Sequence, residues 1–273
     1  MIICSIAVVT VYIPSKSEEA WYGEVTGNIC KIASNTEQVH QMRHALKWDS
    51  LYMSKMDDKS LIEPLTGIGR HPFAEVGCQS VYQTTSIFDI SYLKIADYCN
   101  KPPPRRSYFF DMGCSMYDET KAIAAGLSSS IPLFENMYTN SCISFDKVIG
   151  WEARPYPHWW KKVPTHKRNH IEFINHKVDA DQIRARLTEV DQLDFVVIKL
   201  DIDLTETEIK ILNVLEENAH LVDELFFEYH YYFDGLNFGW GKNDHIMKNH
   251  NATSAIQLFS RLRKKGTRAH FWI

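Results

Sequence analysis

Four charged side chains gather at the end of one apolar run in the second half of the chain. Residues 195–200 are apolar apart from Lys199, and Asp201, Asp203 and Glu206 follow closely. A short apolar run of this kind is typical of a buried strand. Isolated ionised groups beside a buried strand cost several kcal/mol, so these four must pair or hold a ligand. The alternative to a ligand site is a Lys199 salt bridge to Asp203 or Glu206 that only caps the next helix.

The next apolar run ends in Glu228-Tyr229-His230. Alternate side chains of a strand lie on one face, so we expect Glu228 and His230 to lie side by side. A histidine titrates near neutrality and is therefore a candidate general base. With Asp201 and Asp203, this pair also suits one hard divalent cation such as Mg²⁺ or Mn²⁺. That metal site stays open as an alternative.

Two earlier apolar runs also lead to a carboxylate. The first ends in Asp111-Met112-Gly113, and the second ends in Trp151-Glu152. Glycine lets the backbone approach a ligand closely. An acidic residue one βα unit later can accept hydrogen bonds from both ribose hydroxyls of a nucleoside. The alternatives are an ordinary turn at Gly113 and an isolated surface carboxylate at Glu152.

The chain around these charged strand ends has the pattern of alternating strands and helices. Such alternation predicts βαβ units around a buried parallel sheet, whose ligands bind beyond the carboxyl ends of the strands. The polarity pattern predicts strands over 107–112, 147–153, 171–178, 195–202, 225–230 and 268–272, and helices over 128–141, 181–193, 206–219 and 254–265.

A proline run divides the chain near residue 104. Pro102-Pro103-Pro104 stops a helix and removes backbone donors, so it indicates a rigid connector. We expect an N-terminal extension or lid of mixed structure over residues 1–104 and a Rossmann-like domain over 105–273. The apolar run 1–13 indicates a buried strand or a clipped signal anchor. Both a cytoplasmic location and a Golgi or secretory location therefore stay open. Membrane association is expected only if residues 1–13 belong to an anchor.

The composition excludes two classes of protein. The chain has 273 residues, of which 45% are hydrophobic and 12% aromatic, which allows a full core and excludes disorder. A formal net charge of −4 gives no polycationic surface, so we expect a small-molecule or glycan partner and no nucleic acid. Six scattered cysteines without a CxxC pair predict mostly reduced core thiols rather than a zinc site or a dense disulfide framework.

The charged strand ends resemble those of FkbM-type S-adenosylmethionine-dependent O-methyltransferases. The segment Lys199-x-Asp201-x-Asp203-x-x-Glu206 is similar to their Lys-x-Asp-x-Glu-Gly-x-Glu segment, and Glu228-x-His230 is similar to the Glu-x-His strand end that follows it. The Asp111-x-Gly113 turn and Glu152 complete a resemblance that covers about residues 107–273. The cofactor loop departs from the family pattern, because Gly113 is followed by Cys114-Ser115-Met116-Tyr117 rather than by further glycines.

The resemblance implies an α/β fold with a Rossmann-like, seven-stranded, mostly parallel sheet, the last strand antiparallel, with helices on both faces and an N-terminal extension. It implies transfer of the methyl group of S-adenosylmethionine to a hydroxyl of a sugar or glycan, with Asp201 or His230 as the base. The residues that it implies for cofactor binding are Asp111, Gly113, Ser115, Glu152, Ala153 and Asp179, and those that it implies for catalysis are Lys199, Asp201 and His230.

Two other functions stay open. The crowded loop after Gly113 favours a catalytically degenerate, methyltransferase-fold binding protein. Another sugar-modifying or nucleotide-dependent transferase on a similar sheet is the second. The segment 158–168 combines tryptophans with lysines, an arginine and histidines, a set that can stack on a sugar or a base or form a solvated loop face.

Overall fold

The computed structural model describes residues 49–53, 59–62, 90, 93–120, 129–229 and 252–272. Strands β1 (Asp49–Met53) and β2 (Lys59–Ile62) form an antiparallel pair. The apolar run 1–13 lies outside the described residues, as does most of the predicted extension over 1–104. In the described part of the chain, no helix has the length and apolarity that crossing a membrane requires.

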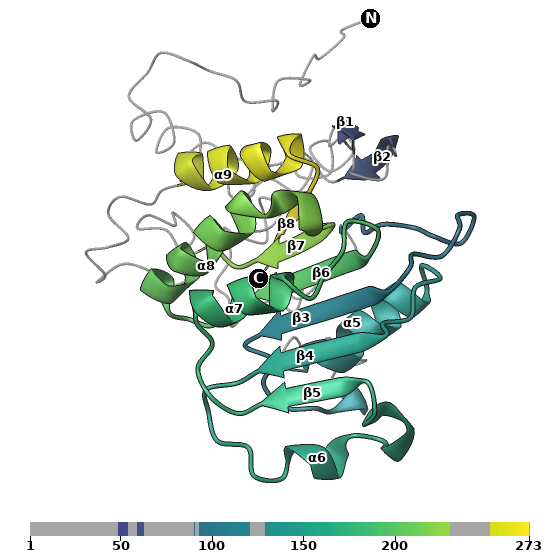
Figure 1. Cartoon of the computed structure of the whole chain (residues 1–273), viewed down its shortest axis with the longest axis vertical. Coiled ribbons are helices and arrows are strands. Elements are labelled where there is room, and N and C mark those ends of the chain that lie inside the picture. The colour runs from purple at the N-terminus through teal and green to yellow at the C-terminus, as the bar shows by residue number, and fades with distance from the viewer. Residues whose placement is uncertain are drawn as a thin grey trace, which may run out of the picture.

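A six-stranded sheet forms the centre of the molecule (Figure 1). Its order is β5-β4-β3-β6-β7-β8, and each neighbouring pair is parallel. The predicted Rossmann-like α/β sheet is confirmed at this level. The strands are β3 (Ser107–Met112), β4 (Lys147–Trp151), β5 (Ile171–Ile174), β6 (Phe195–Leu200), β7 (Glu224–Phe227) and β8 (Arg268–Phe271).

The last described strand differs from the expectation. We expected a seventh, antiparallel strand, whereas β8 pairs with β7 in parallel and the described sheet has six strands. The physical reason is the helix over Ala252–Lys264, which follows β7 in the chain and leads directly into β8. A helical crossover of this kind returns the chain to the same edge of the sheet and so gives a parallel partner.

Helices cover both faces of the sheet, as predicted (Figure 1). Helix α5 (Ser130–Thr139) and the single turn α6 (Trp159–Lys162) lie on one face, whereas α7 (Ala180–Leu187), α8 (Thr205–Glu217) and α9 (Ala252–Lys264) lie on the other. Short 3₁₀ turns occupy Thr165–Lys167 and Ala219–Leu221. Every residue of β3 and β6 is buried, because these central strands have helices above and below them.

Two apolar clusters form the core, one on each face. The cluster under α7, α8 and α9 includes Phe110, Ile198, Leu212 and Phe259. The cluster under α5 and α6 includes residues before the predicted boundary at 105, among them Leu93 and Tyr98, together with Phe109, Phe134, Phe226 and Trp272. The core of the sheet domain therefore contains side chains from the segment 93–98.

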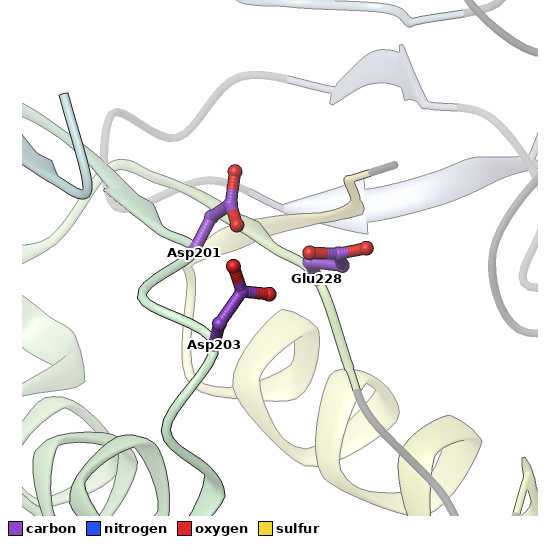
Figure 2. Close-up of side chains that lie close together, drawn as sticks. All are labelled: Asp201, Asp203 and Glu228. Carbon is purple, nitrogen blue, oxygen red and sulfur yellow. The ribbon is translucent and has the colours of Figure 1, made fainter. Parts of the chain in front are cut away.

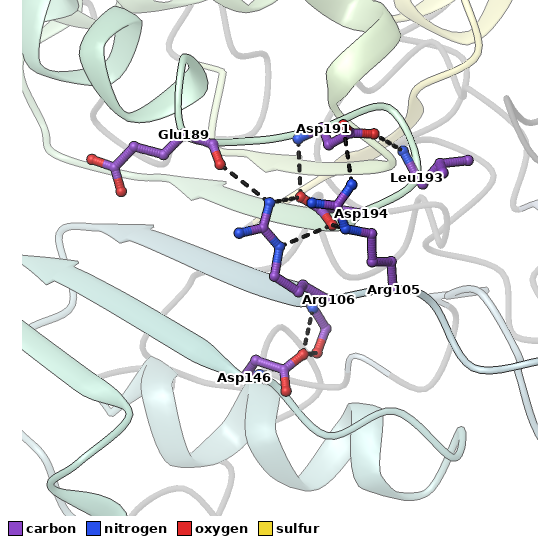
Figure 3. A network of polar contacts seen from close by, with 8 residues as sticks. Arg105, Arg106, Asp146, Glu189, Asp191, Leu193 and Asp194 are labelled. Atoms are coloured by element: carbon purple, nitrogen blue, oxygen red, sulfur yellow. Dashed lines mark hydrogen bonds and ion pairs between the residues drawn. The ribbon is translucent and has the colours of Figure 1, made fainter.

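Arginines of the connector fasten the N-terminal edge of the sheet (Figure 3). Arg106 Nη2 lies 2.6 Å from Asp194 Oδ2, and Arg105 lies 3.2 Å from Asp191. The Asp194 side chain is fully buried. Burial alone would raise the pKa of Asp194. The hydrogen bonds from Arg106 and from the backbone of Asp191, together with the charges of Arg106 and Arg105, outweigh burial and hold that pKa below its ordinary value. The connector is thus held at the start of β6 by paired charge.

One disulfide lies among the cysteines that were predicted to be mostly reduced. Cys99 and Cys142 are bonded, with their Cα atoms 4.9 Å apart. The backbone N–H of Tyr98 donates to the carbonyl of Ser141 at 3.0 Å, and this contact brings the two cysteines within bridging range. Cys114 is a buried free thiol. The remaining cysteines, Cys4, Cys30 and Cys78, lie outside the described residues.

Candidate functional site

The carboxyl ends of β3, β4, β6 and β7 bring together most of the predicted site. Asp111 in β3 lies opposite Lys199 in β6 and opposite Gly150 in β4. Glu152 and Asp201 directly follow the ends of β4 and β6. Because parallel strands end at one edge of a sheet, these side chains share that edge. His230 lies outside the described residues, so its predicted role as a base stays a prediction.

Lys199 joins two of these carboxylates. Its side chain is buried, and its Nζ lies 3.0 Å from Asp201 Oδ2 and 3.5 Å from Asp111 Oδ1. It also donates to the carbonyl of Gly113 at 3.1 Å. Burial alone would lower the pKa of Lys199, but Asp201 and Asp111 outweigh burial and raise that pKa, so the lysine stays charged. Lys199 therefore holds the side chains of Asp111 and Asp201 in place.

The alternative role considered for Lys199, as a cap for the next helix, is wrong. The lysine pairs with Asp201 and Asp111 rather than with Asp203 or Glu206. Glu206 instead pairs with Lys210 on the exposed side of α8, at 2.9 Å. The reason is register: Lys199 lies beside Asp111 on the adjacent strand, and side chains directly opposite each other in a parallel pair share a face.

Asp111 is a fully buried carboxylate. Ser130, the first residue of α5, donates its hydroxyl to Asp111 Oδ2 at 2.5 Å. Burial raises the pKa of Asp111 to about 6, and Lys199 and Ser130 limit that rise by favouring the ionised form. The side chain is therefore mostly ionised at neutral pH. The sequence analysis did not identify Ser130 as a site residue. Its position at the start of the helix that follows the glycine turn is the signal that could have identified it.

The backbone around position 113 leaves no room for any residue other than glycine. It adopts a φ of +86°, and a Cβ at this position would lie 1.8 Å from the carbonyl oxygen of Asp201. The backbone N–H of Asp201 in turn donates to the carbonyl of Met112 at 3.1 Å. The space that a Cβ would take is filled by the backbone of Asp201, and the predicted contact of Gly113 with a cofactor stays a prediction. The turn and the Asp201 strand end are therefore fixed to each other.

Glu152 lies at the end of β4 with both carboxylate oxygens bonded. Its Oε2 accepts from the backbone N–H of Ser115 at 2.9 Å, and its Oε1 accepts from that of Arg154 at 2.7 Å. Glu152 is 9% exposed. Ser115, predicted to bind the cofactor, thus contacts the predicted ribose-binding carboxylate directly. Ala153, also predicted to bind the cofactor, is the exposed residue that follows Glu152.

Asp179 begins helix α7. Its carboxylate accepts from the backbone N–H of Gln182 at 2.9 Å, and the Gln182 side chain accepts from the backbone N–H of Asp179 at 3.1 Å. This capping box explains why the helix begins at Ala180, close to the predicted start at Asp181. Asp179 is exposed and borders an open hollow of about 420 Å³ between α7 and α8. Its role near an adenine ring stays a prediction.

Three acidic side chains converge beside the loop after β6 (Figure 2). Ligand oxygens of Asp201, Asp203 and Glu228 all lie within 4.8 Å of one another. Asp203 is exposed, and Glu228 is buried. Three carboxylate oxygens suit a hard cation, although exposed acidic groups often lie together without one. The fourth predicted metal ligand, His230, lies outside the described residues, so the metal site stays a prediction.

Five carboxylates lie at these strand ends. Lys199 is buried and pairs with two of them, Asp111 and Asp201. Carboxylates attract a cationic ligand and repel phosphate groups. The carboxylates are Asp111, Glu152, Asp201, Asp203 and Glu228.

The aromatic and basic segment 158–168 packs onto the protein through Trp159, Lys167 and Arg168. Trp159 is 3% exposed and stacks on Phe173 with ring centroids 4.1 Å apart. Arg168 donates to two backbone carbonyls, and Lys167 pairs with Glu135 at 2.8 Å. The solvent-facing aromatic residue is Trp160, which is 38% exposed. Three of the groups that could have bound a ligand therefore support the fold. The others, His158, Trp160, Lys161, Lys162 and His166, are exposed, in line with the alternative of a solvated loop face.

Comparisons of the chain with protein-family models, curated proteins and solved structures give no match. The resemblance to FkbM-type methyltransferases over about residues 107–273 therefore stays a prediction.

Proposed function

We propose that this protein is an S-adenosylmethionine-dependent O-methyltransferase that binds its cofactor across the ends of β3 and β4. The observation that carries the proposal is the position of Asp111 and Glu152 at the carboxyl ends of adjacent strands, beside the Lys199–Asp201 pair. In an open sheet of order β5-β4-β3-β6-β7-β8, ligands bind where the strand order reverses. Asp111 and Lys199 lie on the two strands that meet at that point.

The residues present fit this cofactor. S-adenosylmethionine supplies a methyl group on a positively charged sulfur. The carboxylates of Asp111 and Asp201 favour that charge and the charge of the ammonium group. Glu152 is placed to accept hydrogen bonds from ribose hydroxyls. A dinucleotide is disfavoured at the same site, because its pyrophosphate would face these carboxylates.

The chain's own side chains have separate roles in this proposal. Lys199 holds Asp111 and Asp201 at fixed positions and stays charged. Asp201, whose side chain is 24% exposed, is the base that we assign to the acceptor hydroxyl, with His230 as the alternative. A base near the hydroxyl removes its proton while the site positions the oxygen for in-line attack.

A hollow lined by both polar and apolar side chains supports a sugar or glycan as the acceptor. It has a volume of about 210 Å³ and lies between α8 and α9. Glu208 and Thr205 line it from α8, and Ser254, Gln257 and Arg261 line it from α9. Glu208 also accepts from the backbone N–H of Ile202 at 3.1 Å, which connects the hollow to the loop that carries Asp201. Such donors and acceptors suit the hydroxyls of a carbohydrate.

A binding protein without turnover is the second candidate. The buried Cys114 and the Ser115–Glu152 hydrogen bond occupy the turn where further glycines were expected, and this favours it. Binding of S-adenosylhomocysteine without methylation of any sugar in an acceptor panel would support that alternative.

Glu152→Gln tests the proposed function. We expect binding of S-adenosylhomocysteine to weaken by about 10- to 100-fold, because hydrogen bonds to a charged group each contribute about 1.5–3 kcal/mol. Isothermal titration calorimetry measures the affinity. The control is Glu206→Gln, which removes an exposed carboxylate on α8 and should leave the affinity unchanged. Equal affinities for the two variants and the wild type would contradict the role of Glu152.

A further inference from the structure

Trp159 connects the helical turn α6 to the loop that carries Ser115. Its indole Nε1 donates to the carbonyl oxygen of Ser115 at 3.0 Å. The ring is buried and stacks on Phe173, with an interplanar angle of 4°. Both contacts hold the indole in one orientation. The Ser115 carbonyl is therefore held by a rigid donor from a different element.

The backbone of Ser115 links Trp159 to Glu152. Its φ is +53°, a left-handed conformation that is uncommon for a residue with a side chain. In this conformation its backbone N–H donates to Glu152 Oε2 at 2.9 Å. A strained backbone conformation persists only when its surroundings enforce it. The hydrogen bond from Trp159 to the carbonyl of the same residue is one such restraint.

The other carboxylate oxygen of Glu152 is held by the turn at Arg154. Glu152 Oε1 accepts from the backbone N–H of Arg154 at 2.7 Å. Asn175 Nδ2 donates to the backbone carbonyls of Glu152 and Arg154, at 2.7 and 2.6 Å, and so holds that turn closed. A carboxylate offers about four lone-pair sites, so two backbone bonds fix its plane and leave capacity for two more. A pair of adjacent ribose hydroxyls supplies two donors.

We propose that Trp159 is a positioning residue that orients Glu152 toward a ribose diol, acting through the backbone of Ser115. The inference rests on the proposed function, since it assigns Glu152 to the ribose of the cofactor. It replaces the stacking role expected for Trp159 in the sequence. Asn175 has the equivalent role on the Arg154 side of the carboxylate.

Trp159→Phe tests the inference, because phenylalanine keeps a ring against Phe173 and removes the indole donor. The ligands are S-adenosylhomocysteine and its 2′-deoxy analogue, each titrated by calorimetry. We expect affinity for S-adenosylhomocysteine to fall by about 3- to 10-fold, and the preference over the 2′-deoxy analogue to shrink. The matched control is Trp160→Phe, the same change at the neighbouring exposed residue, which should alter neither value.

Each outcome decides the inference. An equal loss of affinity for both ligands, or no loss, would overturn it while the proposed function stands. A wild-type protein that binds neither ligand would overturn the proposed function as well. Thermal denaturation of each variant reports whether it is folded. If Trp159→Phe fails to fold, Asn175→Ala on the exposed side of the turn must give the same selective loss, and its failure to do so would overturn the inference.

Discussion

Replacing Lys199 with methionine is expected to lower the free energy of unfolding by about 3–5 kcal/mol, because it leaves buried carboxylates without their cation. Asp111 is fully buried and lies 3.5 Å from Lys199 Nζ, and Asp201 lies 3.0 Å from it. Methionine keeps the length of the side chain and removes its charge and its donors. Urea denaturation followed by circular dichroism measures the loss.

The loss should depend on pH. Burial already raises the pKa of Asp111 to about 6, and the charge of Lys199 opposes that rise. Without Lys199 the folded-state pKa rises further, whereas in the unfolded chain the carboxyl titrates near its ordinary value. Ionising Asp111 in the variant then opposes folding, so the deficit should be small near pH 5 and larger near pH 8. A deficit that does not vary with pH would contradict this account.

A surface pair provides the control for Lys199. Lys210 lies 2.9 Å from Glu206 on α8, and both side chains are more than 60% exposed. Lys210→Met should cost less than about 1 kcal/mol, because exposed ion pairs contribute little. Adding Asp111→Asn to the Lys199→Met variant should recover part of its loss, since it removes a buried charge. Equal losses for the two lysine variants would contradict the role assigned to Lys199.

Gly113→Ala should be the second severe change. The methyl group would lie 1.8 Å from the Asp201 carbonyl oxygen, at a φ of +86°. A left-handed conformation alone costs a residue with a side chain about 1–3 kcal/mol. The backbone overlap must add to this cost, because the turn and the end of β6 have to separate. We expect a total loss of about 3 kcal/mol or more, with weakened binding of S-adenosylhomocysteine, by denaturation and calorimetry.

Gly150→Ala is the matched control on the neighbouring strand. A Cβ there would lie 2.9 Å from Cys114 Sγ and 3.0 Å from Ile131 Cδ1, which are side-chain atoms that can shift. Overpacking of this kind typically costs about 1–3 kcal/mol. A Gly113→Ala variant that is as stable as Gly150→Ala would show that the turn after β3 moves freely from the end of β6.

Gly113 and Lys199 belong to both the fold and the candidate site. A substitution at either position is expected to disturb the strand ends themselves, so a lost activity there would not separate ligand contact from folding. Glu152 and Trp159 offer the cleaner tests of function. The hydrogen bonds tested there are the one from Ser115 to Glu152 and the one from Trp159 to Ser115, and Trp159→Phe keeps an aromatic ring in the core.

The sequence predicted the sheet well because the signals are local. Buried parallel strands such as β6 are continuous apolar runs, and the intervening helices have their own periodicity and caps, as at Asp179. The position of charged residues at strand ends was readable for the same reason. The expectation of an antiparallel last strand came from the resemblance rather than from any local pattern, and β8 is parallel.

The partners of individual side chains could not be predicted in this way. The Cys99–Cys142 bond joins residues 43 apart in the sequence, and only packing brings them together. The pairing of Lys199 with Asp111 depends on which strand lies beside β6. Trp159 gave a signal for ligand stacking, but its burial against Phe173 was set by tertiary structure.

The most direct measurement is parallel calorimetric titration of the full chain with S-adenosylmethionine and with NAD⁺. Binding of a cationic nucleoside beside the carboxylates at the ends of β3 and β4 predicts saturable binding of S-adenosylmethionine, weakened by added salt, and no binding of NAD⁺. Binding of NAD⁺ in preference to S-adenosylmethionine, or binding of neither, would contradict the proposal.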